Sequence, residues 1–82
     1  MTDVKVGDPI ILVDNAGFED TLEKGMLGWA NSVTHVPGDG AYVFFMPREG
    51  KEMYVTQAYK VVVDEEAKAA GLTLNEHTIA KG

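Results

Sequence analysis

Two glycine motifs constrain this chain more than any other feature. The first is Val6-Gly7-Asp8, and the second is Lys24-Gly25-Met26-Leu27-Gly28. Between them lie an apolar run at residues 10–13 and a polar, acidic stretch at 14–24. Glycine within a strand marks a bulge or a place where another backbone comes close. The pair therefore predicts the first two strands of a small β protein, joined by a long loop.

The rest of the chain predicts three more short strands and one helix. Residues 4–6 are interpreted as a short entry strand, and the non-alternating run at 10–13 is typical of a buried strand. Further strands are expected over 25–36, 41–46, 51–57 and 60–63, with turns at 36–40 and 47–50 and a helical turn at 57–59. Asp64 is expected to cap a helix over 65–70 that ends at Gly71. In the tight loop at 47–50, Gly50 is expected in the left-handed conformation.

Charge and composition exclude several classes of protein. The 82 residues predict one domain, and there are no cysteines to serve as disulfides, thiolate ligands or nucleophiles. Thirteen acids stand against seven bases, for a net charge of −6, and the bases are scattered. Phosphate-binding surfaces need clustered lysine and arginine, so nucleic acid is not an expected partner. No signal peptide or membrane-spanning run is recognised, so a cytoplasmic protein without a membrane partner is expected.

The order of these motifs resembles the SH3-like barrel. The resemblance is carried by Val6-Gly7-Asp8, Gly25-Met26-Leu27-Gly28, Tyr42-Val43-Phe44-Phe45, Tyr54-Val55 and Tyr59-Lys60-Val61-Val62. It covers roughly residues 4–63 and implies an all-β fold, a five-stranded SH3-like barrel. With the short C-terminal helix expected above, the domain is expected to span residues 1–74, followed by a flexible tail at 75–82. The opening is similar to that of KOW-type barrels. KOW-type barrels that contact RNA are usually basic here, whereas residues 1–33 of this chain hold six acids and two bases.

The resemblance also bears on the kind of partner. Peptide-binding SH3 domains need an aromatic motif after the first strand and a tryptophan that opens the third. This chain has Asp14-Asn15-Ala16-Gly17 and Gly40-Ala41 at those places, so binding of proline-rich peptides is not expected. What the likeness implies is an accessory barrel of the kind found on larger enzymes, electron-transfer complexes or phage assemblies.

The densest apolar segment, residues 42–46, predicts an interaction surface. Alternation along a strand places Val43 and Phe45 on one face, with Tyr42, Phe44 and Met46 on the other. Aromatic residues and methionine are enriched at interfaces. The residues expected to dock a partner are Tyr42, Phe44, Met46 and Tyr54, and those expected to steer a basic partner are Glu19, Asp20 and Glu23. The alternative is that the C-terminal helix covers this face together with Leu72, Leu74 and Ile79.

No catalytic, cofactor or metal site is expected. Asp14, Glu19, Asp20 and Glu23 could offer oxygen ligands, but their spacing matches no EF-hand loop. His35 and His77 have no sequence-defined catalytic partner, and Trp29 is interpreted as a core residue, with an exposed anchor as the alternative. The expectation is a non-enzymatic protein-interaction or accessory module. A homo-oligomer formed through the same face, a nucleic-acid-associated KOW-like barrel and a small enzyme subunit with an interface site remain alternatives.

Overall fold

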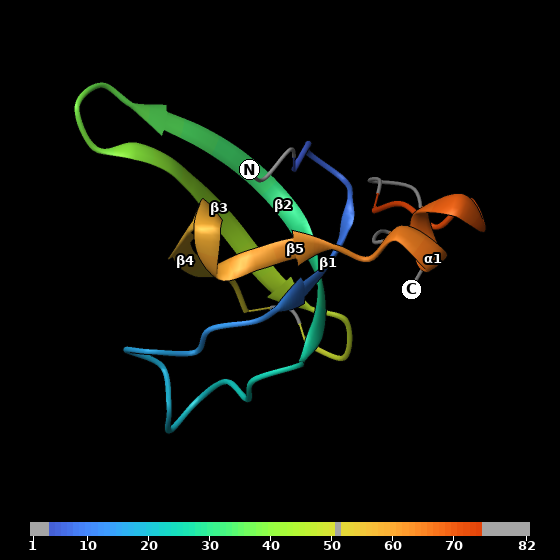
Figure 1. The fold of residues 1–82 in the computed structure, drawn as a ribbon. Coiled ribbons are helices and arrows are strands. Elements are labelled where there is room, and N and C mark those ends of the chain that lie inside the picture. The colour runs from blue at the N-terminus through green and yellow to red at the C-terminus, as the bar shows by residue number, and fades with distance from the viewer. Residues whose placement is uncertain (1–3, 51, 75–82) are drawn as a thin grey trace.

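The chain folds mostly into β-strands. A computed structural model describes residues 4–50 and 52–74 (Figure 1). The strands are β1 (Pro9–Leu12), β2 (Leu27–Val36), β3 (Gly40–Pro47), β4 (Tyr54–Gln57) and β5 (Val61–Val63). A 3₁₀ turn, η1 (Ala58–Lys60), joins β4 to β5, and a short helix, α1 (Glu65–Ala69), follows β5.

The five strands form one antiparallel sheet in the order β4-β3-β2-β1-β5. β4 and β5 stand at opposite edges of this order and do not pair with each other, so the described sheet is not closed. The long strands β2 and β3 form an extended hairpin that projects away from α1 in Figure 1. Their register shifts between Ala30 and Ser32, which identifies a β-bulge at Asn31.

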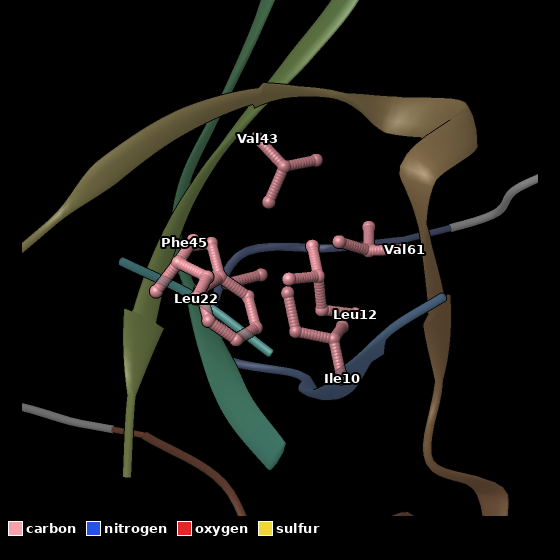
Figure 2. Close-up of a cluster of buried hydrophobic side chains, with 7 residues drawn as sticks. Ile10, Leu12, Leu22, Val43, Phe45 and Val61 are labelled. Atoms are coloured by element: carbon pink, nitrogen blue, oxygen red, sulfur yellow. The ribbon is translucent and has the colours of Figure 1, made fainter. Parts of the chain in front are cut away.

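One apolar cluster fills the inner, concave side of the sheet. Figure 2 shows its labelled side chains directed toward one another. The cluster consists of Ile10, Leu12, Leu22, Ala30, Val43, Phe45 and Val61, each no more than 1% exposed. Of these, Leu22 is the one that lies in a loop rather than a strand, and sequence reasoning did not place it in the core. The expectation that Val43 and Phe45 face the core is confirmed.

Gly28 lies against this core, as the second glycine motif suggests. A Cβ built on Gly28 would stand 2.6 Å from the Phe45 ring and 2.7 Å from the Met46 carbonyl oxygen. No side chain fits there, so glycine is required for β2 to lie flat against β3. Gly25 has a different role, because its φ of 91° turns the chain into β2.

Three local expectations are wrong. Residues 4–6 form no strand; instead the Asp8 carboxylate accepts a hydrogen bond from the Lys5 N–H at 2.9 Å and closes a turn. Gly50 does not adopt a left-handed φ. The loop after β3 is also longer than the predicted turn at 47–50, because β4 begins only at Tyr54.

The helix forms where its capping residue predicts. The Asp64 side chain accepts from the Ala67 N–H, and Glu65 and Glu66 occupy the first turn. Gly71, with a φ of 87°, follows the helix, as expected for a helix exit. Beyond it, the Leu74 N–H and the Thr73 hydroxyl donate to the Gly7 carbonyl at 2.8 and 3.0 Å. The expected tail at 75–82 lies outside the described residues.

Candidate interaction surface

Side chains from β3 and β4 form an apolar strip on the outer side of the sheet. The register pairs Phe44 with Val55, so these two side chains project from the same face. Tyr42 lies two residues before Phe44 and is half-buried, as is Phe44 itself. Val55 is 49% exposed. We call Tyr42, Phe44 and Val55 the outer strip. Two of the four residues expected to dock a partner, Tyr42 and Phe44, belong to it.

Tyr54 does not belong to this surface. It pairs directly with the fully buried Phe45 and packs against the core cluster, so it projects from the inner face. Its ring meets that of Phe18 edge to face, with centroids 5.9 Å apart. The prediction that Tyr54 shares a face with Phe44 is therefore wrong. Val55 takes its place, which only the β3–β4 register reveals.

Met46 does share the outer face with Phe44, but it is only 7% exposed. It lies opposite Trp29 in the sheet and offers a partner little surface. The three residues expected to cover this face differ in their surroundings. Leu72 is 47% exposed, Leu74 is bonded to Gly7, and Ile79 lies outside the described residues.

Trp29 is half-buried rather than a member of the core cluster. The guanidinium carbon of Arg48 lies 4.8 Å from the Trp29 ring centroid, a cation–π contact. The same guanidinium pairs with the Asp64 carboxylate at 3.3 Å, and Asp64 also caps α1. Arg48 therefore ties the end of β3 to the start of α1. The sequence carries no local signal for this contact, because the three residues lie far apart in the chain.

The acids expected to steer a partner lie exposed on the loop between β1 and β2. Glu19 accepts a hydrogen bond from the Gly17 N–H at 3.2 Å. Phe18 and Leu22 anchor the loop by packing into the core on the inner side of the sheet. Glu19, Asp20 and Glu23 thus share one loop, which packs against the face opposite the outer strip.

The described residues hold no group of three or more histidine, cysteine or acidic side chains that could bind a metal ion. His35 lies exposed in β2 opposite Ala41, and His77 is outside the described residues. Within the described part of the chain, no helix has the length and apolar character needed to cross a membrane.

The outer strip carries one titratable group with a shifted pKa. The Tyr42 hydroxyl donates to the Asp39 carboxylate at 2.9 Å. This hydrogen bond, then desolvation, then the charge of Asp39 raise the pKa of Tyr42 above its ordinary value of 10.0. A raised pKa means that the folded chain holds the phenol proton more tightly than the unfolded chain. The resulting stabilisation is present below pH 10 and is lost as the pH rises through the folded-state pKa.

We therefore expect Asp39→Asn to lower the pKa of Tyr42 toward its ordinary value. The measurement is an ultraviolet titration of tyrosinate, with Tyr42 assigned by comparison with Tyr42→Phe. The matched control is Glu52→Gln, because Glu52 accepts from Tyr54 at 2.7 Å and raises the pKa of that residue instead. An unchanged Tyr42 titration in Asp39→Asn would show that the hydrogen bond does not persist in solution.

The molecule thus presents an outer strip of two aromatic residues and a valine, and an acidic loop on the other side of the sheet. Comparison with known proteins gives no relative from which a role could be carried over, because no family model, curated protein or solved structure matches this sequence.

Proposed function

We propose that this chain is a non-catalytic interaction module that docks a basic protein through the outer strip. The observation that carries the proposal is the exposure of Val55 directly beside Phe44 on a sheet face. Aromatic side chains such as Phe44 and Tyr42 are enriched at protein interfaces. The net charge of −6 favours a partner of opposite sign.

We further propose that the sheet belongs to the SH3-like barrel class. The support is the strand order β4-β3-β2-β1-β5, the long loop between β1 and β2, and the 3₁₀ turn before β5. In this interpretation the core cluster fills the barrel interior, and the outer strip lies on its outside wall. The acidic loop then acts at long range on the approach of a partner rather than within the contact.

The test compares variants at Val55 with a variant at Val6. A binding protein is captured from a lysate of the source organism, identified and purified, and its affinity is then measured. We expect Val55→Asp to weaken binding about tenfold, as loss of one buried valine contact implies. Val55→Lys should weaken it further through a slower association rate at low salt, because the partner is basic. Val6→Asp changes a side chain that is 65% exposed in the turn before β1 and should leave the affinity unchanged.

Circular dichroism of each variant establishes that it is folded before binding is compared. Equal affinities for Val55→Asp and Val6→Asp would refute docking through the outer strip. A concentration-dependent dimer, seen by light scattering and dissolved by Val55→Asp, would assign the strip to a second copy of this chain instead. Val55→Lys binding more tightly than Val55→Asp would refute a basic partner.

A further inference from the structure

A second apolar surface crosses the other half of the sheet. The registers place Ile11 of β1 opposite Val62 of β5 on one side and opposite Leu27 of β2 on the other. Residues directly opposite one another in antiparallel strands project from the same face, so these three side chains form a row. Val62 is 41% and Leu27 44% exposed, while Ile11 is half-buried between them. We call these three residues the apolar row.

The apolar row leads into a cleft through Leu27. The cleft has a volume of about 330 Å³ and is lined by Met26, Leu27, Pro47, Arg48 and Glu49. The Arg48 N–H donates to the Leu27 carbonyl at 3.3 Å, which holds the two walls together. This volume is at the lower end of the range for ligand sites, about 300–1,000 Å³, so the cleft has room for a large side chain.

Charge distinguishes between the possible occupants of the cleft. Arg48 is already neutralised by Asp64 at 3.3 Å and covered on one side by Trp29. Glu49 is exposed and takes part in no ion pair with another described residue. Among the described residues, the rim of the cleft therefore carries one acidic side chain without an ion-pair partner, within a chain of net charge −6. An anionic occupant would be repelled, whereas a cation beside an apolar group meets both features of the cleft.

We propose that the cleft and the apolar row bind a segment of a partner protein in which a large apolar side chain stands next to a lysine or arginine. The apolar side chain enters the cleft between Met26 and Pro47, and its basic neighbour pairs with Glu49. The rest of the segment lies over Leu27, Ile11 and Val62. This site uses none of the outer-strip residues, so it stands whether or not the outer strip docks a partner.

The test uses short peptides as probes of the cleft. N-acetyl-Phe-Lys-amide carries the apolar group and the cation, N-acetyl-Phe-Glu-amide reverses the charge, and N-acetyl-Ala-Lys-amide removes the large side chain. Trp29 is the single tryptophan of the chain and contacts Arg48, so its fluorescence reports on the cleft. Amide chemical shifts of Leu27 and Glu49 locate the binding.

We expect saturable binding of the Phe-Lys peptide, with the other two at least about threefold weaker, as one exposed ion pair or one lost apolar contact implies. Glu49→Gln should lower the affinity for the Phe-Lys peptide about threefold, and it should not lower the affinity for the Phe-Glu peptide. Leu27→Thr, which introduces a β-branched residue that suits a strand, should weaken binding of all probes that carry the Phe side chain.

Val55→Asp serves as the control that separates this site from the outer strip, and it should bind the Phe-Lys peptide as the unaltered protein does. Equal binding of the Phe-Lys and Phe-Glu peptides would overturn the proposal. So would shift changes gathered at Tyr42 and Val55, or the absence of any saturable change. Weaker binding of the Phe-Lys peptide by Glu49→Gln, with Val55→Asp unaffected, would support the cleft even if the outer strip proves inactive.

Discussion

Gly28→Ala is expected to destabilise the fold by about 3 kcal/mol, at the upper end of what overpacking a core costs. The added methyl would stand 2.6 Å from the Phe45 ring and 2.7 Å from the Met46 carbonyl oxygen. The ring is fully buried and the carbonyl belongs to β3, so neither can move without disturbing the pairing of β2 with β3. For a chain of 82 residues the total stability is roughly 4–12 kcal/mol, so this loss is a large part of it.

The measurement is urea unfolding followed by Trp29 fluorescence and circular dichroism. Gly50→Ala is the matched control, because nothing lies within 4 Å of a Cβ at Gly50 and its φ is not in the left-handed region. That variant should be neutral or slightly stabilising, since alanine restricts the unfolded chain. Similar midpoints for the two variants would show that β2 and β3 do not approach as closely as described.

Leu22→Ala is expected to cost about 3 kcal/mol, within the usual range for a buried leucine. Leu22 is 1% exposed and contributes to the core from the loop between β1 and β2. At the base of the loop, the Gly25 N–H donates to the Leu12 carbonyl and the Leu12 N–H donates to the Met26 carbonyl. Within the loop, Asn15 Nδ2 donates to the Leu22 carbonyl at 2.9 Å. Truncation of Leu22 therefore opens a cavity in the core as well as loosening the loop.

Leu72→Ala makes the same chemical change at a side chain that is 47% exposed, so it should cost well under half as much. The stabilities of the two variants are compared through the midpoints of their denaturant unfolding curves, at an unchanged dependence of the unfolding free energy on denaturant concentration. Equal losses at Leu22 and Leu72 would mean that the loop does not seat its leucine in the core. A loss confined to Leu22 would establish the loop as part of the folded core rather than a solvated connection.

The strands that pack on the core were the most predictable elements from sequence. The apolar run at 10–13 overlaps β1 closely, and the alternation at 42–46 correctly assigns Val43 and Phe45 to the core. Both signals are local: side chains in a strand alternate, and a buried strand shows an unbroken apolar run. Asp64 was likewise recognisable as a helix cap from its position before two glutamates.

The features that sequence reasoning missed depend on contacts between segments that lie far apart in the chain. Which face Tyr54 uses is fixed by its register with Phe45, and a register is set by pairing rather than by the sequence of one strand. Leu22 lies in a loop without periodicity, so nothing local marks it as buried. The stacking of Arg48 on Trp29 and its ion pair with Asp64 join three elements across the fold. The location of the candidate surface on β3 was therefore predictable, whereas the full set of residues that form it was not.

The hydrogen bonds from Leu74 and Thr73 to the Gly7 carbonyl bring residues 7 and 74 within 2.8 Å of each other at their backbone atoms. Two segments from near the ends of the described fold therefore meet at one point, a geometry that suits insertion into a surface loop of a host protein. The same proximity makes the fold suitable for circular permutation. New termini would be placed at the β2–β3 turn, where Gly38 and Gly40 are exposed.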